Sequence, residues 1–178
     1  MDHAIDQGFA FGHGNGTNHH YGYNIRKIYD AMWLMRDKIA ARGKTDEYVK
    51  VLAYWSGLAE TRKPYVYGRD ELLDSWHTLL IPKIVSALML PDEAEQYRAM
   101  KSLGVWLSGS LGFTPGTIGG IKPDGTTFHH GGFYPAYSTG AFAMIGYFCK
   151  ATRGTDFTLS EQARRNFKLA LMTMASYT

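Results

Sequence analysis

The sequence of 178 residues contains a single cysteine, Cys149. One thiol cannot form an internal disulfide, and a thiolate metal site needs several. Residues 1–4 have neither the basic start nor the apolar stretch of a signal peptide, and no apolar run approaches the length of a membrane span. We therefore expect no membrane association, and any export signal to lie outside this sequence.

Clustered charge is also missing. The net charge is +3 with seven histidines counted as neutral, and the isoelectric point is about 8.9. Lysines and arginines are scattered along the chain, as on a solvated surface, whereas a nucleic-acid interface needs a basic patch or stripe. The pattern argues against a nucleic-acid partner, and the mild positive surplus suits an acidic one.

Aromatic residues are abundant, at 14% of the chain. Aromatic rings stack on sugars, but they also fill hydrophobic cores, and composition alone favours the core. The same two interpretations apply to the individual candidates for sugar stacking, which are Tyr21, Trp33, Trp76 and Trp106.

Apolar residues recur at three- and four-residue steps over most of the chain, which predicts helices. We expect helices over about 24–42, 46–61 and 70–90, a fourth opened by residues 91–93, a fifth over about 138–152, and a sixth from a capping box at 158–161 to the end. Gly43 should end the first helix, and Pro82 should kink or break the third. Residues 1–23, rich in glycine, should form an extended, turn-rich entry segment.

No β-type alternation of any length is found. The predicted fold is therefore all-α, a single domain over 1–178 in which helical hairpins form part of an incomplete α/α toroid. Residues 112–136 form a long loop rich in glycine and proline. A loop of this length within a compact domain is usually functional or disordered, and its histidines and aromatics favour function.

Two segments are candidates for chemistry, because both place imidazoles and phenols on glycine-rich backbone just before a helix. They are residues 18–23 (NHHYGY) and residues 123–137 (PDGTTFHHGGFYPAY). The histidines at 3, 13, 19 and 20 could form a metal site. However, adjacent side chains point in different directions and the helical His-x-x-x-His spacing is absent, so we expect no metal site.

These two segments resemble the chondroitin ABC-type polysaccharide lyases. In that family an Arg-Pro-Asp-Gly-Thr run leads to an aromatic residue, the catalytic His, and a Tyr-Pro-x-Tyr run ending in the catalytic Tyr. Here Lys122 begins the equivalent run, followed by Phe128, His130 and the segment from Tyr134 to Tyr137. The segment 18–23 is similar to the family's upstream His-His-aromatic-Gly-Tyr run. The likeness covers residues from about 17 to 178. It departs from the family at His129, where the family has an arginine, and at Phe133, where the family has a polar residue.

The resemblance implies that the chain is the central part of a helical lyase catalytic domain, with candidate catalytic residues His130, Tyr137 and His19. The candidate substrate-binding residues are His20, His129, Tyr134 and Trp76. It implies an acidic glycosaminoglycan substrate, no required cofactor, possible modulation by divalent cations, and a secreted or periplasmic bacterial location. The family's catalytic Arg and Glu fall outside this sequence, so the remainder of a longer chain should complete the active site, and this segment alone should be inactive.

Lyases of this kind cleave the bond to C4 of a uronic acid by β-elimination. Removal of the C5 proton builds negative charge beside a carboxylate, which donors must neutralise. The resemblance assigns that task to His19, or alternatively to His20. Tyr137 would serve as base and acid for glucuronate, and His130 as the base for iduronate. A phenol ordinarily titrates near pH 10, so such a tyrosine needs a cationic neighbour.

Two other classes of protein remain open. One is a helical carbohydrate-binding module without turnover. The other is an α/α-toroid glycoside hydrolase, which needs two facing carboxylates. The available acids are Glu71, Asp92 and Asp124, and none lies in a convincing cleft motif.

Overall fold

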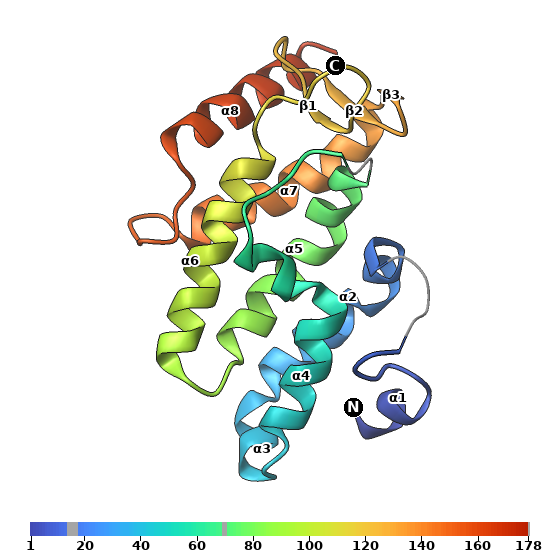
Figure 1. The fold of residues 1–178 in the computed structure, drawn as a ribbon, viewed down its shortest axis with the longest axis vertical. Helices are drawn as coiled ribbons and strands as arrows, with labels where there is room; N and C mark the ends of the chain where they lie inside the picture. The colour runs from blue at the N-terminus through green and yellow to red at the C-terminus, as the bar shows by residue number, and fades with distance from the viewer. Residues whose placement is uncertain (14–17, 69–70, 178) are drawn as a thin grey trace.

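The computed structural model describes residues 1–13, 18–68 and 71–177, leaving aside the side chains of residues 18 and 19. Its helices are α1 (Asp2–Asp6), α2 (Asn18–Leu34), α3 (Arg36–Ala41), α4 (Thr45–Ser56), the short 3₁₀ helix η1 (Leu58–Arg62), α5 (Leu72–Leu88), α6 (Glu93–Ser110), α7 (Pro135–Ala151) and α8 (Glu161–Ala175) (Figure 1). The all-α class predicted from the sequence is confirmed, while closure into a toroid and the single domain stay predictions.

Helix α5 is the centre of the fold, since it packs against α2, α4, α6 and α7. Its N-terminal half supplies Trp76 and Leu80 to a core that α6, α7 and α8 complete. Its C-terminal end supplies Val85 to a second core formed with α2, α3 and α4. The long apolar helix predicted over 70–90 therefore holds the two halves of the molecule together (Figure 1).

Three short antiparallel strands lie between α6 and α7, where the sequence predicted only a loop. They are β1 (Gly120–Ile121), β2 (Thr127–His129) and β3 (Gly132–Phe133), in the order β1-β2-β3. Gly120 pairs with Phe128, and His129 pairs with Gly132. Strands of two or three residues are too short to give an alternating pattern, which explains why the sequence analysis missed them.

The extended, turn-rich segment predicted over residues 1–23 needs correction, because several of the described residues in this range are helical. They include α1, and α2 begins at Asn18 rather than near residue 24. Tertiary packing explains the earlier start: a Cβ placed on Gly22 would lie 2.2 Å from Thr78 Oγ1. The glycine that weakens helix propensity thus allows the first turns of α2 to lie directly on α5.

Three further helix predictions need correction. The helix expected over 24–42 is interrupted at Met35, and α5 continues through Pro82 to Leu88 instead of breaking. A capping box was expected at 158–161, but the N-cap of the last helix is Ser160. The Ser160 hydroxyl accepts a hydrogen bond from Ala163 N. The predicted end at Gly43 is confirmed, since it follows α3 with a φ of 64°.

None of the helices in the described part of the chain combines the length and the hydropathy that crossing a bilayer would require.

Candidate active site

His130 lies in a tight turn at the tip of the small sheet. It and Gly131 join β2 to β3, with φ values of 51° and 74°, as in the two-residue turn that matches the twist of a hairpin. His130 is the one non-glycine residue with a positive φ in the described chain. That conformation costs an ordinary residue roughly 1–2 kcal/mol. The turn belongs to the hairpin formed by β2 and β3, and the imidazole of His130 is exposed to solvent there.

Tyr137 lies in the first turn of α7, directly after the sheet. Pro135 starts the helix with a ring that fixes φ and needs no intrahelical donor. The hairpin is tied to this turn by a hydrogen bond between Thr127 and Ser138, and by Tyr134 N donating to Thr127 O at 3.1 Å. These contacts fix the half-buried Tyr137 relative to the strand that ends at His129.

Four rings from β2, the turn and the start of α7 form one cluster, which comprises His129, His130, Tyr134 and Tyr137. The ring centroids of His130 and Tyr137 are 6.1 Å apart, and those of Tyr134 and Tyr137 are 4.8 Å apart. His129 lies beneath, with its centroid 3.9 Å from that of His130 and 4.5 Å from that of Tyr137. The two residues proposed to react are therefore neighbours, and the cluster presents an imidazole and a phenol side by side at the surface.

A buried carboxylate lies behind this ring cluster. Asp74, in the first turn of α5, is 2% exposed, and its Oδ2 lies 3.4 Å from His129 Nε2. Tyr23 of α2 donates to the other carboxylate oxygen at 2.5 Å. Burial, and then this hydrogen bond, raise the pKa of Tyr23 well above its ordinary value, so the phenol stays a neutral donor. The carboxylate thus joins α2 and α5 to the hairpin.

A second imidazole, His77, lies one helical turn further along α5. Its ring meets that of Tyr23 edge-on at 5.4 Å, and its Nε2 lies 3.3 Å from Arg26 Nη1. Burial, and then the neighbouring guanidinium, lower the pKa of His77. The face of α2 that carries Tyr23 and Arg26 therefore lies against α5 at Asp74 and His77.

The loop before the hairpin is folded around the side chain of Lys122. Its ammonium group donates to Ile118 O at 2.6 Å, to Thr114 Oγ1 at 3.0 Å and to Thr114 O at 3.3 Å. It also lies 4.6 Å from the centre of the Phe128 ring. Burial lowers the pKa of this amine. The lysine that stands at the family's Arg position therefore holds the loop in shape.

The Pro-Asp-Gly-Thr run forms the turn between β1 and β2. The Asp124 carboxylate accepts hydrogen bonds from Thr126 N at 2.9 Å and Thr126 Oγ1 at 2.7 Å, and these bonds lower its pKa. Gly125 has a φ of 83°, and a Cβ there would lie 2.2 Å from Thr173 Oγ1 on α8. This run therefore builds a turn that packs closely on α8.

The other residues singled out from the sequence lie in different surroundings. The side chain of His19 is outside the described residues, and His20 is exposed in the first turn of α2. Tyr134 is 42% exposed and borders the ring cluster. Trp76 is 1% exposed and donates to Ser110 Oγ at 3.0 Å, so it has the core role that the sequence also allowed. His129 is 0% exposed, which leaves it no surface for a sugar in this structure.

Sequence reasoning missed Asp74 as a site residue and gave Tyr23 no role of its own. Asp74 looks like an ordinary acidic residue in the first turn of a helix. One sign was available: its neighbours are Leu72, Leu73, Trp76 and Leu79, which places it on an apolar stretch where a carboxylate is rarely buried without partners. Its partners come from distant parts of the chain, and the sequence does not reveal them.

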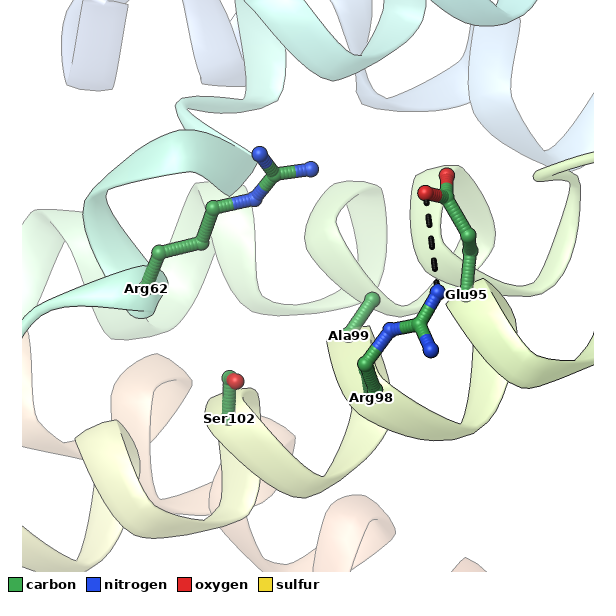
Figure 2. Close-up of a pocket in the computed structure, with 5 residues that line it drawn as sticks. All are labelled: Arg62, Glu95, Arg98, Ala99 and Ser102. Atoms are coloured by element: carbon green, nitrogen blue, oxygen red, sulfur yellow. Dashed lines mark ion pairs between the residues drawn. The ribbon is translucent and has the colours of Figure 1, made fainter.

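A surface pocket of about 270 Å³ lies away from the hairpin, between η1 and the N-terminal half of α6. Figure 2 shows the Arg62 side chain extending from η1 on one side of the pocket and the ion pair of Arg98 with Glu95, at 3.7 Å, on the other. The pocket contains none of the clustered rings. Within residues 1–13, 18–68 and 71–177, no three histidine, cysteine or acidic side chains gather as metal ligands would.

Comparison with known proteins identifies the family to which this helical chain belongs. The model of the family described as "Lyase, catalytic" matches residues 1–178, and the chain belongs to this family. It is 36% identical over 180 residues to a chondroitin sulfate ABC exolyase of Bacteroides thetaiotaomicron. It is 30% identical to a chondroitin sulfate ABC exolyase and to an ABC endolyase of Proteus vulgaris, over 176 and 178 residues. Each match covers 99% of this chain but only 17% or 18% of the relative.

Proposed function

We propose that this chain is part of a glycosaminoglycan lyase that cleaves chondroitin sulfate and dermatan sulfate by β-elimination, with hyaluronan as a further candidate substrate. The observation that carries the proposal is the pairing of His130 with Tyr137, their ring centroids 6.1 Å apart, in a chain of a lyase family. The substrate class is taken from the chondroitin sulfate lyases that the chain resembles. The secreted or periplasmic location belongs to this proposal.

The chemistry proposed for Tyr137 is proton transfer. As the phenolate, its oxygen accepts the C5 proton of a glucuronate residue, and the phenol so formed donates a proton to the leaving oxygen on the same face of the sugar. Iduronate presents its C5 proton from the opposite face. His130, exposed on the hairpin turn beside Tyr137, is the base for that epimer. Tyr137 therefore protonates the leaving oxygen with either epimer, whereas Tyr137 and His130 divide the abstraction of the C5 proton between the epimers.

Neutralisation of the uronate carboxylate is the remaining requirement. His19 is the proposed donor and His20 the alternative, with Tyr134 contributing to sugar binding at the border of the ring cluster. On α2, Tyr23 binds Asp74, which lies behind the ring cluster, and Arg26 lies beside His77. The Arg and Glu that the family resemblance implies would come from other parts of the protein.

Product analysis with the protein at its full natural length tests the proposal. Elimination leaves a conjugated double bond that absorbs ultraviolet light, whereas hydrolysis adds water and gives no such absorbance. We expect absorbance to rise with chondroitin sulfate and with dermatan sulfate. Cleavage to saturated products would instead identify a glycoside hydrolase, and binding without cleavage would identify a carbohydrate-binding module. Either result would overturn the proposed function.

A further inference from the structure

The Asp74 carboxylate is buried at the junction of α2, α5 and the hairpin. With 2% of its surface exposed it has lost nearly all contact with water, and such a group needs partners that replace hydration. Tyr23 Oη supplies one at 2.5 Å, and His129 Nε2 faces the second carboxylate oxygen at 3.4 Å. Breaking a buried arrangement of this kind is costly, so its presence beside the ring cluster calls for an explanation.

His129 connects this carboxylate to the two residues proposed to react. One edge of its ring faces Asp74, while its faces lie against the rings of His130 and Tyr137, at 3.9 Å and 4.5 Å between centroids. The ring is 0% exposed, so it does not reach substrate. Any rotation of the His129 ring would push against both neighbours. Its orientation therefore sets the spacing between the imidazole and the phenol.

We propose that Asp74 is a positioning residue, which acts through His129 to hold Tyr137 and His130 in the geometry that the reaction needs. The inference rests on the proposed function, because it assumes that these two side chains react. The carboxylate fixes the edge of the His129 ring, and the ring forms the wall against which the phenol and the imidazole pack. Tyr23 fixes the carboxylate from the side of α2.

This role differs from simple support of the fold in what it predicts for kinetics. A misplacement of about 1 Å at a reacting group costs on the order of 10²-fold in rate. Substrate binding through other residues would persist, so the loss should fall on kcat and leave KM close to the wild-type value. A residue that only supports the fold would lower the amount of folded enzyme and leave kcat per folded molecule unchanged.

The test uses the protein at its full natural length, with chondroitin sulfate as the substrate. Asp74→Asn keeps the shape of the side chain but replaces an acceptor oxygen with a donor, and we expect kcat to fall by about 10²-fold. The matched control is Ser110→Ala, which removes another buried hydrogen bond made by α5, from Trp76 Nε1. This control should lower thermal stability and keep the wild-type kcat per folded molecule.

A double-mutant cycle then asks whether Asp74 acts through His129. If it does, Asp74→Asn and His129→Gln should each lower kcat, and the double variant should lose little more than either single variant. Additive losses in kcat, or wild-type kcat for Asp74→Asn, would overturn the inference. Should Asp74→Asn fail to fold, His129→Gln alone decides, since wild-type kcat in that variant also overturns it.

Failure of the inference can be told apart from failure of the proposed function. A Tyr137→Phe variant that cleaves as fast as wild type would show that Tyr137 is not the reacting phenol. The chemistry of the proposed function and the role of Asp74 would then both be overturned. An inactive Tyr137→Phe variant beside a fully active Asp74→Asn variant would leave the proposed function standing and overturn only the role of Asp74.

Discussion

Gly140 of α7 lies directly against the imidazole of His77 on α5, so closely that a Cβ on the glycine would be 2.6 Å from the ring. This contact lets the two helices approach at the end where Tyr137 lies in the first turn of α7 and Asp74 in the first turn of α5. The sequence shows only a glycine within a helical pattern, where it lowers helix propensity. The structure shows that the close approach of two site-bearing helices requires it.

Gly140→Ala should therefore destabilise the protein and reduce activity together. Overpacking of a tight contact costs about 1–3 kcal/mol, and relief of the clash would move the first turn of α7. The matched control is Gly146→Ala on the same helix, where a Cβ would meet nothing within 4 Å. That change should be neutral or slightly stabilising. Thermal unfolding of both variants checks this, and equal melting temperatures would contradict it.

Lys122→Met should destabilise the loop before the hairpin. The ammonium group donates to Ile118 O, Thr114 Oγ1 and Thr114 O, and its removal leaves buried oxygens without these donors. Each unsatisfied buried group costs about 1–3 kcal/mol. Lys150→Met, on the exposed surface of α7, is the control. Hydrogen exchange of residues 112–126 should become faster in the first variant alone, and unchanged exchange would rule out the lysine as the support of this loop.

His130→Asn should keep the stability of the hairpin while it removes the imidazole. Asparagine tolerates the positive φ of this turn, and Asn-Gly is a favoured pair there. Cleavage of dermatan sulfate should fall by about 10²–10⁴-fold, as expected for loss of a general base, and cleavage of glucuronate chains should fall less. The measurement is kcat/KM for both polymers under one salt condition. Equal losses would make His130 a shared positioning group, and no loss would make it a structural turn residue.

Cys149 should react slowly with alkylating reagents near neutral pH. Burial raises the pKa of its thiol, and the thiolate is the reactive form. The unfolded thiol ionises at a lower pH, so this contribution to stability is present below the unfolded-state pKa and is lost as pH rises above it. Labelling by iodoacetamide is unambiguous because the chain has one cysteine. Identical pH profiles for the native chain and the chain in urea would contradict the prediction.

The helices were predictable where an apolar period runs without interruption, as in α6 and α7, whereas the helix predicted over 46–61 ends at Ser56 and is followed by η1. Errors arose where tertiary contacts outweigh local preference: Gly22 is helical because it packs on Thr78, and Pro82 lies within an unbroken α5. The hairpin was missed because its strands are two or three residues long.

The candidate site could be predicted where it lies within one segment. His130 and Tyr137 belong to a single recognisable run, and the structure places them side by side. The pairing of Asp74 with His129 could not be found in this way, because α5 and the hairpin meet only in the folded chain. Nor does local sequence show that His129 is buried while its neighbour His130 is exposed, since the turn that separates them depends on strand pairing.

The most direct test of the account is the rate at which the full natural protein forms unsaturated product from chondroitin sulfate and dermatan sulfate, measured for wild type, Tyr137→Phe and Tyr147→Phe. Tyr147 lies on the same helix and is 59% exposed, so its variant controls for the loss of a phenol hydroxyl. We predict that Tyr137→Phe abolishes cleavage of both polymers, because the leaving oxygen needs a proton with either epimer, and that Tyr147→Phe retains the wild-type rate. A Tyr137→Phe variant that still forms unsaturated product at the wild-type rate would contradict the account.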